Sequence, residues 1–126
     1  NRSPLPSSSL RLLLLLLLLC GIAGNAIYIN HVANDMSRMT EALPDIGEEG
    51  CAEAAASLRD YWERNVPYVG LSVGYPVTDR VSEQAAVLSA CAACGDLFGY
   101  RSALALLQDA IGDVRRLEKI SIENLL

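Results

Sequence analysis

Eight consecutive leucines, Leu12–Leu19, constrain the fold of this chain more than any other feature. Between Leu12 and Ile29 only Asn25 is strongly polar. An apolar segment of this length can cross the hydrocarbon core of a bilayer as a helix. We therefore expect a transmembrane anchor over residues 12–30, preceded by a disordered lead over residues 1–11 and followed by one domain over residues 31–126.

A cleaved signal peptide is the main alternative to an anchor. The leucines would be its apolar region, and Gly24-Asn25-Ala26 supplies small residues near a cut. Because the chain begins with Asn rather than Met, we expect it to be a fragment or to be processed. A three-four spacing of apolar residues favours an uncleaved anchor, because it predicts one helix that leaves the membrane as a stalk and becomes the first helix of the domain. These residues are Ile22, Ile29, Val32, Met36, Met39 and Leu43.

The distribution of charge predicts the orientation of this anchor. Arg2 and Arg11 precede the apolar run, and no base follows it until Arg38. By the positive-inside rule, the N-terminus lies in the cytoplasm and the domain outside it. Beyond Ile29 the chain carries 8 basic and 15 acidic residues, a net charge of −7. Nucleic acid is therefore not an expected partner, because binding it needs a clustered basic face.

A second helix is predicted after a break at Pro44-Asp45-Ile46-Gly47. Asp45 or Gly47 can begin it, and Pro67 should kink or end it because proline lacks a backbone donor. Its apolar face consists of Cys51, Ala55, Leu58, Trp62 and Val66.

Two further helices follow a break at Gly74-Tyr75-Pro76. Thr78 or Asp79 can cap the third helix, and Gly95-Asp96 can close it, since glycine suits a left-handed C-cap. Its apolar face consists of Val77, Val81, Ala85, Leu88 and Ala92. The last helix should run from Leu97 to Asn124. Its stripe is Leu97, Tyr100, Leu104, Leu107, Ile111 and Val114, extended by Leu117 and Ile120.

No segment alternates with the two-residue period of a strand, so the predicted fold class is all-α. We expect an N-terminal transmembrane helix that continues into a small antiparallel bundle of three to four helices.

Cys91 and Cys94 have the spacing of a thiol-redox motif. Such a motif normally lies at a helix N-terminus after a strand, where one thiol pKa is lowered. These cysteines instead fall in the last turns of an alanine-rich helix, so we expect them to pack in the core. With no second pair and no neighbouring histidine, a metal site is not expected. The three cysteines of the domain cannot all pair with one another, which argues against a disulfide framework.

Other candidate site residues have simpler structural interpretations. His31, the only histidine, lies where the chain leaves the membrane and matches no catalytic triad motif. Trp62, with Tyr61 and Tyr68, fits core packing better than ligand stacking. Arg115, Arg116 and Lys119 fit a solvated face late in a helix. The sequence therefore predicts no catalytic, cofactor-binding or metal-binding residue.

In its overall pattern the chain resembles an uncharacterised bacterial family, domain of unknown function 4363. The matching pieces follow the membrane helix in order. They are Trp62 and Tyr68, Thr78-Asp79-Arg80-Val81, Gly95-Asp96 with Tyr100, and the ending Leu117-Glu118 to Asn124-Leu125-Leu126. The resemblance implies a short single-pass membrane protein of Gram-positive bacteria with no assigned activity. The family often has a histidine before the third helix, where this chain has Tyr75 or a neighbour. Sporulation stage III AB-type membrane proteins are similar in layout but not in these residues.

Together these patterns predict a membrane-anchored helical protein of the bacterial envelope that is not an enzyme. Its partners would be the membrane, through Leu12–Ile29, and either another envelope protein or a second copy. The alternative is a secreted or anchored thiol-redox protein or enzyme that uses Cys91 and Cys94.

Overall fold

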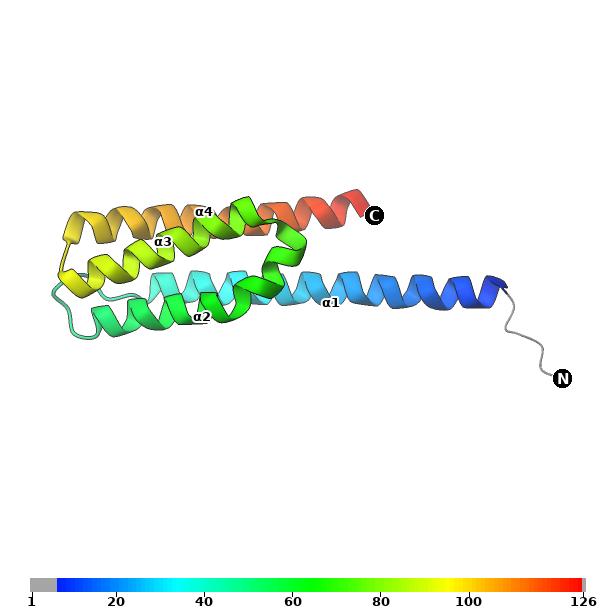
Figure 1. The fold of residues 1–126 in the computed structure, drawn as a ribbon, viewed down its shortest axis with the longest axis horizontal. Helices are drawn as coiled ribbons and strands as arrows, with labels where there is room; N and C mark the ends of the chain where they lie inside the picture. The colour runs from blue at the N-terminus through cyan, green and yellow to red at the C-terminus, as the bar shows by residue number, and fades with distance from the viewer. Residues whose placement is uncertain (1–6, 126) are drawn as a thin grey trace.

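The computed structural model describes residues 7–125, which form four α-helices (Figure 1). Successive helices run antiparallel and pack as a bundle, and the described residues contain no strand. The all-α bundle with a long apolar N-terminal helix is thus confirmed. The helices are α1 (Ser7–Glu41), α2 (Cys51–Val73), α3 (Tyr75–Cys94) and α4 (Leu97–Leu125).

Helix α1 is continuous over 35 residues and extends far beyond the bundle (Figure 1). It begins at Ser7, inside the segment predicted to be a disordered lead, and the rest of that lead, residues 1–6, lies outside the described residues. The side chains of Leu12–Leu19 are exposed, whereas Ile29 and Met36 are buried. One helix therefore has an exposed apolar half and a half that belongs to the domain, as the spacing of apolar residues predicted.

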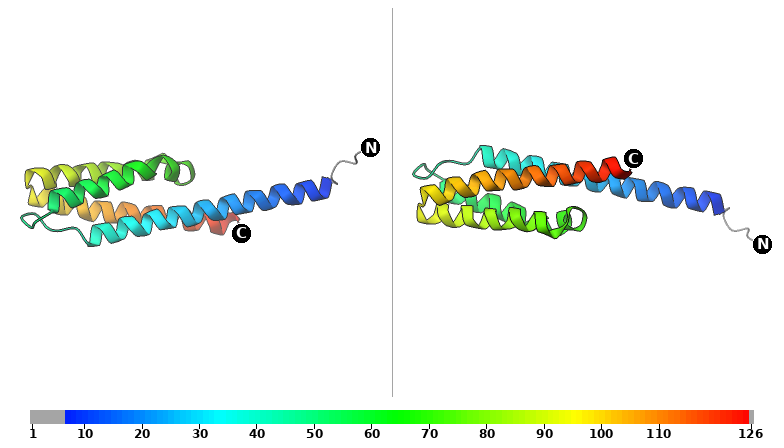
Figure 2. Two further views of the ribbon diagram at one scale, coloured as in Figure 1. Left: turned by 90° about the horizontal axis from the view of Figure 1, so that it is seen from below. Right: turned by 90° about the horizontal axis from the view of Figure 1, so that it is seen from above.

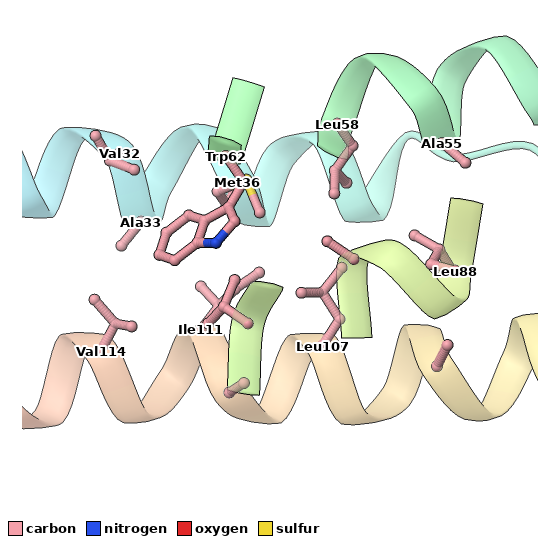
Figure 3. Packing of buried hydrophobic residues seen from close by; sticks show 14 of the residues in the cluster. Val32, Ala33, Met36, Ala55, Leu58, Trp62, Leu88, Leu107, Ile111 and Val114 are labelled. Atoms are coloured by element: carbon pink, nitrogen blue, oxygen red, sulfur yellow. The ribbon is translucent and has the colours of Figure 1, made fainter. Parts of the chain in front are cut away.

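The core lies along the facing stripes of the four helices (Figure 3). Helices α1 and α3 each pack against both α2 and α4. Trp62 and Tyr100 are the largest fully buried side chains, so the predicted stripes of α2 and α4 face the core. Val66, Val77 and Leu104 lie at the edge of the core and are partly buried.

The connection between α1 and α2 is longer than predicted. Helix α2 begins at Cys51 after Gly50, whose φ is +83°, and not at Asp45 or Gly47. Glycine adopts this left-handed conformation without the steric cost of a Cβ. The first turns of α4 hold the connection in place. The Tyr100 hydroxyl donates to the Pro44 carbonyl over 2.6 Å, and Arg101 pairs with Asp45, also over 2.6 Å.

Pro67 does not end the second helix, which continues to Val73. Of the two outcomes expected at Pro67, an end is therefore wrong, and a kink agrees with Figure 1, where the last turns of α2 turn toward α3. Proline lacks a backbone donor, so the helix loses one hydrogen bond and bends there. The helix continues when residues on both sides of the proline are packed against neighbouring helices. Val69 and Gly70, just after the proline, are buried, so this part of α2 remains packed in the bundle.

A single residue, Gly74, separates α2 from α3. Its φ of +100° completes the change of direction that the last turns of α2 begin, and α3 starts at once with Pro76 in its first turn. The prediction that Thr78 or Asp79 caps α3 was therefore wrong. Thr78 is instead buried inside the helix, with its hydroxyl 3.2 Å from the Tyr75 carbonyl.

The turn between α3 and α4 matches the prediction. Gly95 ends α3 in the left-handed conformation, with φ +76°. The Asp96 carboxylate then accepts from the Gly99 amide over 3.0 Å and caps the start of α4. A Cβ at Gly99 would lie 2.6 Å from Cys91 Sγ, so this turn also needs glycine for close packing.

The end of α4 differs from the prediction. The stripe is buried through Val114, but Leu117 and Ile120 are exposed. Figure 2 shows that this end of α4 runs on beside the extended half of α1. Ile122 of α4 and Ile22 of α1 line the same apolar groove there.

Candidate functional site

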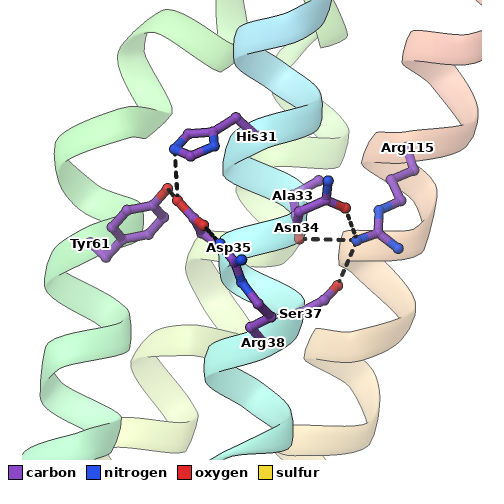
Figure 4. A network of polar contacts seen from close by, with 8 residues as sticks. All are labelled: His31, Ala33, Asn34, Asp35, Ser37, Arg38, Tyr61 and Arg115. Carbon is purple, nitrogen blue, oxygen red and sulfur yellow. Dashed lines mark hydrogen bonds and ion pairs between the residues drawn. The ribbon is translucent and has the colours of Figure 1, made fainter.

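A polar network lies on α1 where the helix enters the bundle (Figure 4). We define the network as His31, Asp35, Arg38 and Tyr61. Asp35 is at its centre. It lies 3.1 Å from the His31 Nε2, accepts a hydrogen bond from the Tyr61 hydroxyl over 2.6 Å, and pairs with Arg38. His31, Asp35 and Arg38 share a face because they are four and three residues apart on one helix.

The titration of this network follows from its geometry. The hydrogen bond from Tyr61, together with the charge of Arg38, lowers the pKa of Asp35 below its ordinary value. Burial and the same hydrogen bond raise the pKa of Tyr61. Asp35 is thus a carboxylate and Tyr61 a neutral donor at neutral pH. Since Tyr61 belongs to α2, the network fastens α2 to α1.

The network does not form a hydrolytic triad. Both the imidazole of His31 and the hydroxyl of Tyr61 meet the carboxylate, so the imidazole is not placed to take a proton from that hydroxyl. The His31 side chain is also 67% exposed. Asp35 was not singled out from the sequence, although its position four residues after His31 could have indicated the pair.

A second set of polar contacts joins α4 to α1 (Figure 4). Arg115 donates to the Asn34 side chain over 2.6 Å and to the Ser37 hydroxyl over 3.1 Å. Arg115, Arg116 and Lys119 are exposed, as expected of a solvated face, and Arg115 also joins α4 to α1. Arg116 is exposed and pairs with Asp113 on its own helix.

The two cysteines of the CxxC spacing have different environments. Cys91 is buried, and Cys94 is exposed at the end of α3, so the expectation of core packing holds for Cys91 alone. Burial, with the nearby Asp96 carboxylate, raises the pKa of the Cys91 thiol. A reactive thiol needs the opposite shift. All four cysteines in the described chain are free, and the described residues contain no group of three that could hold a metal ion.

The aromatic residues of α2 also differ in burial, since Trp62 is buried and Tyr68 is exposed. Trp62 is buried and donates to the Ser82 hydroxyl over 2.8 Å, so its indole belongs to the core as expected. Tyr68 is 62% exposed, so core packing was the wrong expectation for it. Its ring lies edge-on to Tyr28, with 6.4 Å between centroids.

Two polar residues of the apolar run on α1 form hydrogen bonds with α2. The Asn25 amide donates to the Ser72 hydroxyl of α2, and the Tyr28 hydroxyl donates to Asn65 over 2.6 Å. A small pocket beside Asn25 is lined by residues from α1, α2 and α4, including Glu118. The sequence analysis noted Asn25 but missed its partner, because pairing across 47 residues leaves no local pattern.

Helix α1 is long and apolar enough to cross a membrane. A core helix of a soluble protein can meet the same criterion, but such a helix is mostly buried, whereas 6% of the most apolar window of α1 is buried. A signal sequence near the N-terminus also meets it.

Comparisons with known proteins found no matching family model, no matching curated protein and no matching solved structure. The resemblance to the uncharacterised bacterial family stays a prediction.

Proposed function

We propose that this chain is a single-pass membrane protein whose helical domain lies outside the cytoplasm. The domain binds another envelope protein or a second copy of the chain and catalyses no reaction. The observation that carries this proposal is the division of α1 into an exposed apolar half and a half buried in the bundle. A helix built in this way joins a domain to a bilayer without a linker.

The contacts of α1 support an anchor over a cleaved signal. The candidate cleavage residues Gly24-Asn25-Ala26 lie inside the helix. Asn25 donates to Ser72, and Ala26 lines a groove with Ile122 of α4. Cleavage there would remove contacts that complete this end of the bundle.

The polar groups support binding rather than catalysis. Asp35 joins α1 to α2, and Arg115 joins α1 to α4, so both groups are engaged in holding the bundle together. Phe98, at the end of the bundle far from the leucines, is 85% exposed. Phenylalanine is among the aromatic residues that are enriched in protein interfaces.

Membrane integration can be tested by expressing the full chain in bacteria and extracting the membranes with alkaline carbonate. We expect the protein to stay in the membrane pellet at its full mass. A soluble product shortened to begin near Ala26 would contradict the anchor and support a cleaved signal.

Orientation needs a separate test. Arg2 and Arg11 place the N-terminus in the cytoplasm by the positive-inside rule. Protease added to intact spheroplasts should therefore digest the region after Ile29. Full protection, lost on lysis, would contradict this orientation.

Partner binding can be tested with a photoreactive phenylalanine analogue at Phe98 in intact membranes. Glu63, exposed on α2, is the control position. We expect a crosslinked product at Phe98 and little at Glu63. A product at twice the chain's mass identifies a second copy, and any other discrete mass identifies a different partner. Equal yields at both positions, or none, would contradict a specific interface at Phe98.

Thiol titration separates this proposal from the thiol-redox alternative. Cys94→Ala isolates Cys91 within the CxxC, and we expect Cys91 to react slowly near neutral pH because its pKa is raised. Cys94, which is exposed, should react faster than the buried Cys91 because reagents in solution can reach it. Rapid modification of either cysteine with a strongly lowered pKa would favour the redox alternative.

A further inference from the structure

The part of α1 that precedes its first contact with the other helices is no longer than the hydrocarbon core of a bilayer is thick. From Leu12, which follows the charged Arg11, to Gly24 the helix has 13 residues, which span about 20 Å at about 1.5 Å per residue, and the long Arg11 side chain can reach back to the headgroups. The hydrocarbon core of a bilayer is about 30 Å thick. The next residue, Asn25, is already bonded to Ser72 of α2. No free stalk therefore separates the leucines from the domain within the described chain, and the near end of the bundle meets lipid.

The segment at this near end is the tip where α2 joins α3. We define the tip as residues 65–78, which contain no charged residue and lie between Arg64 and Asp79. Leu71 is 79% exposed, Tyr75 67% and Tyr68 62%. Tyrosine is enriched at membrane interfaces, because its ring is apolar and its hydroxyl remains hydrated.

The opposite end of the bundle has a different character. Its connections carry Asp45, Glu48, Glu49 and Asp96, which favour water. The exposed uncharged tip is thus at the end from which the leucines extend (Figure 1).

Charged residues of α4 set the depth of this end. Glu118 lines a pocket with Asn25 and Ser72, and both Lys119 and Glu123 line a groove with Ala26. Charged side chains are costly in hydrocarbon but can reach the headgroup region. The level of Asn25 and Ser72 therefore fits the headgroup region and not the bilayer centre.

We propose that the tip inserts into the headgroup region of the membrane through Tyr68, Leu71 and Tyr75. The domain is then held against the lipid at two places, by α1 and by the tip, and it lies directly on the membrane surface. The occupant of this surface is the lipid interface, because the tip is uncharged and adjoins the membrane helix. This inference rests on the proposed membrane anchor.

Quenching of tryptophan fluorescence by brominated lipids tests the inference in the full chain, reconstituted in phosphatidylcholine vesicles. Leu71→Trp reports the tip, Phe98→Trp is the exposed control at the far end, and Leu16→Trp reports the anchor. Trp62 is common to all variants and is 1% exposed, so its emission is subtracted as background. We expect Leu71→Trp to lose emission most with bromine near the headgroups, Leu16→Trp with bromine deep in the acyl chains, and Phe98→Trp with neither.

The three variants separate the two proposals. Quenching of Leu16→Trp without quenching of Leu71→Trp means that the tip faces water or another protein, which overturns this inference and leaves the anchor intact. Absence of quenching at Leu16→Trp overturns the anchor as well. Tyr68→Trp provides a second probe of the tip if Leu71→Trp alters the helical content measured by circular dichroism.

Discussion

Replacing Leu107 by alanine should destabilise the bundle strongly, because this leucine is fully buried in the middle of the core. Figure 3 shows Leu107 pointing from α4 into the core, in the cluster that also contains Leu58 of α2 and Leu88 of α3. Truncation of a buried leucine removes its transfer energy and leaves a cavity, at a cost of about 2–5 kcal/mol. A domain of this size has about 5–15 kcal/mol of stability in total. One substitution therefore removes a large share of the free energy of unfolding.

Leu106→Ala is a matched control, since the same substitution is made one residue away on the same helix. Leu106 is 48% exposed, so it loses about 1 kcal/mol or less and encloses no cavity. The change in helix propensity is the same for both variants and cancels.

Thermal unfolding of the full chain in detergent, followed by circular dichroism, measures both effects. A loss near 3 kcal/mol lowers Tm by about 12–24 °C in a domain of this size, and a loss of 1 kcal/mol lowers it by about 4–8 °C. Equal and small shifts for both variants would refute the proposed core. The stripe of α4 would then be a surface that binds a partner.

Two further predictions use the same assay. The lowered pKa of Asp35 implies that its stabilising effect is full above the unfolded value of about 3.9 and is lost as the pH falls through the lower folded value. Tm should therefore fall between about pH 5 and pH 2, and Tyr61→Phe should make this fall smaller; an unchanged pH dependence would show that the hydrogen bond does not set the shift. Gly99→Ala should lower Tm although alanine favours helix, because its Cβ would lie 2.6 Å from Cys91 Sγ. Gly112→Ala on the same helix has open space and should raise stability by up to about 1 kcal/mol, so a gain from both would contradict the close packing at Gly99.

The helices and their buried faces could be predicted from the sequence because each helix buries one stripe. The three-four spacing of Leu58 and Trp62 on α2, and of Leu107 and Ile111 on α4, identified core residues correctly. Helix boundaries were predicted less well where backbone geometry decides them. Gly74 alone separates α2 from α3. The sequence Gly74-Tyr75-Pro76 indicates a break but does not distinguish a one-residue connection from a longer loop.

The candidate site was harder to predict for a different reason. Asp35 and Tyr61 are 26 residues apart, and Arg115 reaches Asn34 across 81 residues. Neither pair leaves a local signal. Leu117 and Ile120 show a related limit, because periodicity reveals an apolar stripe but not what covers it. At these two positions α4 has passed the junction of α2 and α3, and the stripe continues as an exposed surface.

The order of the helices along the chain also determines when the bundle can close during synthesis. Helix α4 is a main neighbour of α1, yet it is translated last. About 85 residues follow Glu41, and at about 5–20 residues per second their translation takes about 4–17 s. Throughout that interval the face of α1 that carries Val32 and Met36 has no α4 to cover it. Newly made chains therefore expose this apolar face of α1 until α4 has been translated.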